Sequence, residues 1–427
     1  MSNWKTYTLG KLVKSGGGKI HTGPFGSQLH ASDYVQSGIP CIMPANMKEN
    51  RVDLSGISFI SEQDAARLSK YLVKGGDIVY SRRGDVTLKA LIKDEEEGFF
   101  CGTGCLLLRP GSEIDPEFLT YYLSTDSIKH WIVKQAVGAT MPNLNTGIFS
   151  SIPFTAPTKK EQQKLAAVIS SINQKIELNN KINAELEAMA KLIYDYWFVQ
   201  FDFPDANGKP YKSSGGKMAY NKALKREIPE GWEAVPLDYL VNVITGNVSP
   251  KDMDPNTPYI GLEHIPRKTI VLSEWETAKK VNSDKCVFKK YDILFGKIRP
   301  YFHKVGITFV NGITSTDTIV LRPKKEEFFG LAIQTVFTDI FIETATQTST
   351  GTKMPRANWT VLKNYKVAIP SSQLLNKYQS IIDGVFSRIE SSVYQNKKLS
   401  TLRDWLLPLL MNGQVTVKET EEKFRQE

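Results

Sequence analysis

Two stretches of the chain, residues 157–198 and 370–411, carry the same pattern of apolar and polar positions. In both, a mostly apolar position recurs at alternating intervals of four and three residues, which is typical of a long helix that packs along one face against a second helix. The first stretch has no Pro or Gly after Pro157, and the second has only Gly384 and Pro408 after Pro370. We therefore predict two helices of about 40 residues, each about 60 Å long at 1.5 Å per residue.

The recurring positions form a predicted helix–helix seam. Because the two seams match in length and pattern, packing them against each other is the simplest way to bury both. Asn183 and Asn396 occupy equivalent polar positions, and we expect them to fix the register of the pair at some cost in stability. The seam residues are Leu165, Ile169, Ile172, Ile176, Asn183 and Leu186 in the first helix, and Ile382, Val385, Ile389, Asn396 and Leu399 in the second.

The repeat continues upstream, into the segments that precede the helices. The two helical stretches are offset by 213 positions, and the same offset relates motifs upstream of them. These motifs are Thr103, Leu108-Arg109-Pro110, Met141-Pro142 and Asn145, which recur as Thr316, Leu321-Arg322-Pro323, Met354-Pro355 and Asn358. Nearer the start of each half the shift grows, to 215 between Asp77 and Asp292. A growing shift indicates loops of different length between shared elements, so the chain is an internal duplication and not a solenoid of many repeats.

Short apolar runs bounded by turn residues predict strands in both halves. They lie at residues 39–43, 77–80, 105–108 and 153–156, and again at 259–262, 292–295, 318–321 and 366–369. One or two helices follow each Arg-Pro, at 116–137 and 328–346. The prediction is an α+β fold, in which two equivalent mixed α/β domains are joined by two long helices that form a coiled-coil spacer.

These elements divide the chain into six segments. They are a first globular domain (1–156), a first spacer helix (157–199), a connector (200–230), a second globular domain (231–369), a second spacer helix (370–412) and a charged tail (413–427). The connector carries five Lys and one Arg against one Asp between residues 205 and 226. We interpret it as a solvated tether, with a strap that contacts phosphates as the alternative.

Composition and charge narrow the function classes. The 427 residues carry a net charge of +9 with a pI near 9.1, which is compatible with nucleic acid but does not require it. Residues 1–16 lack the apolar core of a signal peptide, and no apolar run approaches the roughly 18 residues of a membrane span. The lack of such a run predicts no membrane partner. The four cysteines form no CxxC pair, so we expect a protein of the reducing cytoplasm.

Several fragments resemble catalytic motifs, and each departs from its pattern. Residues 100–104 spell the FxGxG of a methyltransferase cofactor loop, yet a predicted strand follows where the loop should open a helix. Residues 256–259 approximate the NPPY that grips a flipped adenine but carry Thr in second place, and residues 15–20 lack two positions of a P-loop. The five histidines are isolated, without metal-ligand spacing. We therefore expect no catalytic residue, no metal ligand and no cofactor on this chain.

Polar and cationic loops close the strands, and these loops hold the candidate binding residues. Arginine contacts phosphates or pairs with guanine, and Asn and Gln pair with adenine. The candidates are Gln28, Arg82, Arg83, Thr140, Asn143 and Asn145 in the first half, and Lys297, Arg299, Tyr301, Lys353, Arg356 and Asn358 in the second. For each, the alternative is a structural role such as a surface ion pair or a loop cap. The predicted strands and helices of the two halves correspond, while their loops differ, as expected of one scaffold that binds two different sequences. We expect such a protein to bind two half-sites about one DNA turn, or 34 Å, apart.

In these features the chain resembles the DNA-specificity (S) subunit of type I restriction–modification enzymes. The resemblance rests on the half-repeat organisation and on Leu-Arg-Pro and Met-Pro ahead of each long helix. It rests also on residues 201–212 and 228–232, at the two ends of the connector. The resemblance covers the chain from Trp4 to about Val417.

The resemblance implies two target-recognition domains separated by antiparallel helices, each of which binds one half of a split site in double-stranded DNA. It implies two modification (methyltransferase) subunits that dock on the helices and domains, and restriction subunits that complete an ATP-dependent nuclease. S-adenosylmethionine, ATP and Mg²⁺ would belong to those partners, and this chain would be non-catalytic. Two other functions stay open on the residues alone: a coiled-coil scaffold without sequence recognition, and a methyltransferase or nuclease that acts by itself.

Overall fold

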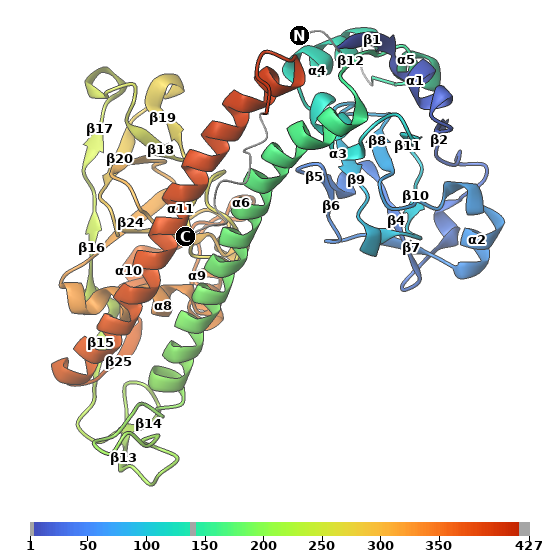
Figure 1. The fold of residues 1–427 in the computed structure, drawn as a ribbon. Coiled ribbons are helices and arrows are strands. Elements are labelled where there is room, and N and C mark those ends of the chain that lie inside the picture. Colours follow the sequence, from blue (N-terminus) through green and yellow to red (C-terminus); the bar gives the residue numbers. More distant parts are fainter. Residues whose placement is uncertain (1–3, 137–141, 418–427) are drawn as a thin grey trace, which may run out of the picture. The chain divides into compact units, whose positions relative to one another are not determined.

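The computed structural model describes residues 4–136 and 142–417, and it divides into two compact units (Figure 1). Unit 1 comprises Met1–Ile176 and Lys398–Glu427, and unit 2 comprises Glu177–Lys397. Two long helices, α6 (Lys159–Tyr194) and α11 (Ser372–Met411), each run through both units. Each unit therefore contains one globular domain together with part of each long helix.

The two helices have the length that the heptad pattern predicts, and they are antiparallel. α6 has 36 residues and continues into a π-helical turn over Asp195–Val199, and α11 has 40 residues. In unit 1, Leu165 near the start of α6 lies in one apolar cluster with Met411 at the end of α11. In unit 2, Tyr378 near the start of α11 lies in one cluster with Phe198, which follows α6. The two pairs are equivalent under the 213-residue shift.

A polar layer interrupts the seam near the middle of α6. Asn179 donates to Asn396 Oδ1 and Asn396 donates to Asn180 Oδ1, both at 2.8 Å. The partners of Asn396 are therefore Asn179 and Asn180 and not Asn183, whose buried Oδ1 has no hydrogen-bond partner among the described residues. Asn183 is itself buried, and it does not face Asn396 because antiparallel pairing does not place equivalent positions opposite each other. Of the other seam residues, Leu165, Ile169, Ile172, Ile382, Val385 and Ile389 are buried, and Ile176, Leu186 and Leu399 are partly buried.

The globular domain of unit 1 is built on two four-stranded sheets, ordered β2-β11-β8-β9 and β10-β4-β7-β3, with β1 paired to β12 and β5 to β6. The strands are β1 Lys5–Thr8, β2 Lys19–Thr22, β3 Tyr34–Val35, β4 Ile39–Ile42, β5 Met47–Lys48, β6 Arg51–Val52, β7 Ser58–Ile60, β8 Ile78–Ser81, β9 Lys89–Leu91, β10 Phe100–Cys101, β11 Cys105–Arg109 and β12 Pro153–Ala156. The helices are α1 Leu9–Ser15, α2 Glu62–Arg67, α3 Pro116–Tyr122, α4 Asp126–Gln135 and α5 Thr146–Ser150.

Unit 2 repeats this arrangement. Its sheet β16-β24-β21-β22 corresponds to the first sheet of unit 1, β23-β18-β19 to β10-β4-β7, and the pair β15–β25 to β1–β12, while β17 and β20 extend the second sheet. The strands are β15 Glu233–Pro236, β16 Val241–Ile244, β17 Asn247–Val248, β18 Pro258–Ile260, β19 Glu276–Thr277, β20 Lys285–Phe288, β21 Ile293–Gly296, β22 Val305–Ile307, β23 Gly312–Thr314, β24 Thr318–Pro323 and β25 Lys366–Ile369. The helices are α7 Leu237–Leu240, α8 Phe329–Phe337, α9 Asp339–Gln347 and α10 Trp359–Leu362. All eight predicted strands and the helices after each Arg-Pro are confirmed.

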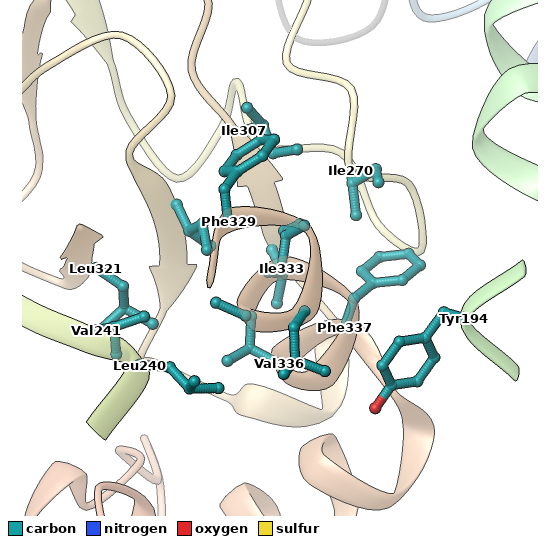
Figure 2. Packing of buried hydrophobic residues seen from close by; sticks show 14 of the residues in the cluster. Tyr194, Leu240, Val241, Ile270, Ile307, Leu321, Phe329, Ile333, Val336 and Phe337 are labelled. Atoms are coloured by element: carbon teal, nitrogen blue, oxygen red, sulfur yellow. The ribbon is translucent and has the colours of Figure 1, made fainter. Parts of the chain in front are cut away.

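The core of unit 2 fixes its globular domain to the long helices. Phe329, Ile333 and Val336 of α8 pack in one buried cluster with Leu321 of β24 (Figure 2). Tyr194 at the end of α6 joins the same cluster, and it lies beside α8 in Figure 2. Each such side chain stabilises the fold by roughly 1.5–3 kcal/mol when fully buried. The globular domain of unit 2 and the adjacent helix ends therefore share one hydrophobic core, which fixes the domain relative to the parts of the helices in the same unit.

The connector is folded, so the prediction of a solvated tether is wrong. β13 (Met218–Asn221) and β14 (Arg226–Pro229) pair as an antiparallel hairpin. Phe201 and Ile228 are buried, and Phe201 packs edge to face against Trp232 with ring centroids 5.4 Å apart. The aromatic side chains of the connector thus bury against the start of the second domain, while its lysines stay exposed.

The repeated Leu-Arg-Pro holds a buried ion pair in each unit. Arg109 donates from Nε and Nη2 to the carboxylate of Asp77 (2.8 and 2.6 Å), and Arg322 donates in the same way to Asp292 (2.8 and 2.7 Å). These hydrogen bonds raise the pKa of both arginines. Each aspartate immediately precedes β8 or β21, and each arginine lies in the neighbouring antiparallel strand. The ion pair therefore sets the register of two strands whose other ends carry the candidate binding loops.

Candidate DNA interface

In unit 1, three segments that are distant in sequence meet where β8 ends. The Arg82 N–H donates to the carbonyl of Gly104 (2.9 Å), and the Leu144 N–H donates to the carbonyl of Arg82 (2.8 Å). A backbone bridge joins Arg83 to Asn143. The structure thus brings together the strand-exit arginines, Gly104 and residues 143–144, as one surface that we call the unit 1 junction.

Unit 2 builds the same junction with different side chains. The Lys297 N–H donates to the carbonyl of Asp317 (3.0 Å), the Ala357 N–H donates to the carbonyl of Lys297 (2.8 Å), and a bridge joins Ile298 to Arg356. Each contact has its counterpart in unit 1, with shifts of 215 for the strand exit and 213 for the other segments. The junction is therefore a property of the duplicated backbone, and the side chains that it presents vary between the units.

The cations of the unit 1 junction are Arg82 and Arg83. Among the described residues, no carboxylate lies within ion-pair distance of Arg82 or Arg83. The Arg82 Nε is buried without a hydrogen-bond partner, and Nη2 makes one long bond of 3.4 Å to Asn143 Oδ1. Its guanidinium lies 5.8 Å from the ring centroid of the half-exposed Phe25. Burial, and then the adjacent Arg83, lowers the pKa of Arg82. An anionic or acceptor ligand would relieve this unfavourable environment.

The cations of the unit 2 junction are partly compensated. Lys297 Nζ and Arg356 Nε lie 4.0 and 3.7 Å from Asp317 Oδ1. Arg299 adopts a left-handed backbone conformation (φ 49°), and its Nε is buried without a partner. Tyr301 is 50% exposed. The exposed Lys353 lies on the loop that leads to Arg356.

Sequence reasoning missed Arg267, whose guanidinium stacks 4.0 Å from the ring centroid of Phe302, the ring that also lies 5.9 Å from Arg299. Arg267 lies in the loop between β18 and β19, away from the repeated motifs, so no pattern in the sequence marks it. Only the fold brings it to the unit 2 junction. It adds a third exposed or partly exposed arginine beside Arg299 and Arg356.

Three candidate residues have structural roles that account for them. Asn145 caps α5 by accepting from the Ile148 N–H (2.8 Å), and its repeat equivalent Asn358 caps α10 by accepting from the Thr360 N–H (3.0 Å). Gln28 Oε1 already accepts two hydrogen bonds, from the backbone N–H of Phe25 (3.2 Å) and from the Tyr71 hydroxyl (2.9 Å). Bidentate pairing of Gln28 with adenine would require these bonds to break. Thr140 lies outside the described residues.

The structure bears on the candidate cofactor loop, on metal-binding groups and on the cysteines. Residues 100–104 lead into strand β11, so they do not open a helix as a cofactor loop would. No group of three or more His, Cys, Asp or Glu side chains in residues 4–136 and 142–417 could hold a metal ion. All four thiols are free, and burial raises the pKa of Cys41 to about 12, which disfavours a thiolate nucleophile.

One more property of the described helices concerns membranes. No single helix is long and apolar enough to span a bilayer, and the one bent pair that passes by composition includes α8, which is buried in the core of unit 2.

A buried lysine makes the stability of unit 1 depend on pH. Lys89 of β9 is 3% exposed, and burial, with Lys129 nearby, lowers its pKa from 10.5 to about 7. Between these values the unfolded chain binds more protons, so stability rises with pH. We predict that Lys89→Met raises the free energy of unfolding by ~1–4 kcal/mol at pH 7. The gain should fall as pH rises toward 10, which urea unfolding of both proteins from pH 6 to 10 would measure. A gain that is equal at every pH would contradict this explanation.

The comparisons with known proteins agree with this geometry. The model of the type I restriction modification DNA specificity domain matches residues 1–188 and 229–399. The MjaIX type I restriction enzyme specificity subunit of Methanocaldococcus jannaschii is 24% identical over 91% of this chain and 89% of its own length. The HindI specificity subunit of Haemophilus influenzae is 22% identical over 97% of this chain and all of its own.

Among solved structures, a type I restriction–modification S subunit from M. genitalium has the same fold. Its TM-score is 0.53 at 16% identity, and the match covers 98% of this chain and 97% of that one. Two matched segments, one in each half of the repeat, account for most of the sequence. The chain therefore belongs to the type I restriction modification DNA specificity domain family and carries this domain twice.

Proposed function

We propose that this chain is the specificity subunit of a type I restriction–modification complex, in which each globular domain binds one half of a bipartite DNA target. The repeated junction supports this most strongly. The same backbone contacts hold Arg82 in unit 1 and Lys297 in unit 2, while the surrounding side chains differ. One scaffold with two sets of side chains suits two different half-sites. In this proposal the chain is not the catalyst, and it acts in the cytoplasm.

The long helices offer contact surfaces for partner subunits. In unit 2, α6 exposes Met189 (42%) and Leu192 (65%), and in unit 1, α11 exposes Leu402 (43%) and Trp405 (62%). The two pairs are equivalent under the 213-residue shift. Exposed apolar side chains at helical spacing are typical of protein contacts. Two equivalent surfaces suit two copies of one partner, so we propose that two modification subunits dock here and that restriction subunits complete an ATP-dependent nuclease.

The cofactors of the reaction would then belong to the partners. S-adenosylmethionine would bind to the modification subunits, and ATP and Mg²⁺ to the restriction subunits. Residues 100–104 lead into strand β11 and not into a helix, so they do not form the loop by which methyltransferases bind S-adenosylmethionine, and this supports the division.

Co-expression of this chain with the modification subunit of its own system, followed by genome-wide mapping of methylated adenines, tests the proposal. We expect two short blocks of defined bases separated by a gap of fixed length. A coiled-coil scaffold without sequence recognition would give methylation without defined blocks. A methyltransferase that acts alone would methylate DNA when the modification subunit is omitted. Either of these two results would contradict the proposal.

Replacing Arg82 with alanine is expected to weaken binding of the complex to its target duplex by ~1–3 kcal/mol if the guanidinium contacts a base. No carboxylate competes for Arg82 among the described residues, so the loss reports on DNA directly. Titrations of target and scrambled duplexes at several salt concentrations would measure it. An equal loss on both duplexes, with a smaller salt slope, would assign Arg82 to a phosphate. The charge-matched control is Arg51→Ala, since Arg51 lies 3.6 Å from Glu117. An Arg82→Ala complex that binds both duplexes like wild type would remove Arg82 from the interface.

A further inference from the structure

A carboxylate lies inside the cationic junction of unit 2. The Asp317 side chain is 35% exposed, and its Oδ1 is 4.0 Å from Lys297 Nζ and 3.7 Å from Arg356 Nε. Both distances are too long for hydrogen bonds. The hydrogen bonds of Asp317 within the described residues use only its backbone, which donates to Ser315 Oγ (3.2 Å) and accepts from Lys297. The carboxylate oxygens therefore retain their acceptor capacity.

The side chain of Asp317 is not required to build the junction. In unit 1 the equivalent position is Gly104, whose carbonyl makes the same contact to Arg82. A carboxylate on a surface that faces phosphates would weaken binding through repulsion. The two cations beside Asp317 offset this repulsion and hold the carboxylate between them. The shared backbone does not need this carboxylate and phosphate binding does not favour it, but base recognition on such a surface can use its free acceptors.

We propose that Asp317 is a specificity-determining residue for the half-site bound by unit 2, where its carboxylate accepts a hydrogen bond from an exocyclic amino group in the major groove. A carboxylate can only accept, so its partner must be a donor, which restricts it to N4 of cytosine or N6 of adenine. Lys297 and Arg356 act as positioning residues. This inference rests on the proposed function, because it assumes that the junction of unit 2 faces DNA.

Base analogues that lack the amino group test the inference. The probes are duplexes that carry the target mapped with the wild-type complex, in which each cytosine or adenine of one half-site is replaced in turn by 2-pyrimidinone or purine. We expect one substitution to weaken binding of the wild-type complex by about 10-fold or more. The Asp317→Ala complex should bind the unmodified target as weakly and should be insensitive to that same substitution. The identity of the sensitive base distinguishes cytosine from adenine.

A second variant separates acceptor from charge. Asp317→Asn keeps an acceptor oxygen, so it should retain part of the discrimination that Asp317→Ala loses. Binding of both variants to scrambled duplex should not fall, because a negative charge has been removed. The control is Glu233→Gln, which removes one charge from an exposed position on β15 of the same unit.

Two results would overturn the inference. Tighter binding of Asp317→Ala to target and scrambled duplex alike would mean that the carboxylate only repels phosphates. Equal sensitivity of wild type and Asp317→Ala to every analogue would mean that another residue contacts the amino groups. A wild-type complex that does not prefer its target over scrambled DNA would instead contradict the proposed function itself, which keeps the two failures distinct.

Discussion

Replacing Asp77 with alanine is expected to lower the free energy of unfolding of unit 1 by about 3 kcal/mol. Asp77 is 1% exposed and accepts two hydrogen bonds from Arg109 and one from the Lys74 N–H (2.8 Å). Its removal leaves a partly buried guanidinium and a backbone N–H without partners, and both costs add. The estimate lies at the lower end of the range for buried pairs because the Arg109 side chain keeps 32% exposure.

Urea unfolding of the full chain, with hydrogen exchange to assign the loss to unit 1, would measure this effect. A matched control is Asp404→Ala, which removes the exposed pair with Arg403 (2.9 Å) in the same unit and should cost less than about 1 kcal/mol. The double replacement Asp77→Leu with Arg109→Met should recover much of the stability, because no charge is then left buried. Equal effects of Asp77→Ala and Asp404→Ala would contradict a buried ion pair that fixes the strand register.

Inserting one heptad into both long helices is expected to abolish recognition of the original target and to create a target with a longer gap. The pairing of Asn179 with Asn396 puts the midpoint of the antiparallel pair at Lys181 and Tyr394, which are equivalent under the 213-residue shift. Seven residues inserted after each of these positions keep the seam in phase and lengthen both helices by about 10 Å. At about 3.4 Å per base pair, the gap should grow by about three base pairs while both blocks of bases stay the same.

Methylation mapping of cells that express the lengthened chain would measure the gap. The control is an insertion of two residues at the same two positions, which rotates the seam by about 200° to the opposite face and should abolish specific methylation. An unchanged gap after the heptad insertion would show that the helices do not set the spacing between half-sites.

The long helices and the duplication could be predicted from sequence because both depend on patterns that are local or repeated. The heptad spacing marked α6 and α11, and apolar runs marked β8, β11 and their equivalents in unit 2. Strands of two residues, such as β5, β6 and β19, carry no such pattern and were missed. They exist because tertiary packing pairs them, which a single sequence does not display.

The junctions were predicted only in part, for the same reason. Arg82 and Asn143 were each candidates, but their meeting depends on the packing of the loop before α5 against the end of β8. Asp317 was missed, although the sequence held a signal, since it replaces a glycine of the first half at an equivalent position. The fold of the connector was likewise signalled by Phe201 and Trp232, whose burial outweighs the flexibility that its glycines and lysines suggest.

The central claim is that each globular domain recognises one half of the target independently of the other. Maps of methylated sites for the wild-type, Arg82→Ala and Arg299→Ala complexes test it most directly. We expect two blocks of defined bases for wild type, relaxed recognition in one block only for Arg82→Ala, and relaxed recognition in the other block only for Arg299→Ala. A single continuous target, or relaxation of the same block by both variants, would contradict the assignment of one half-site to each domain.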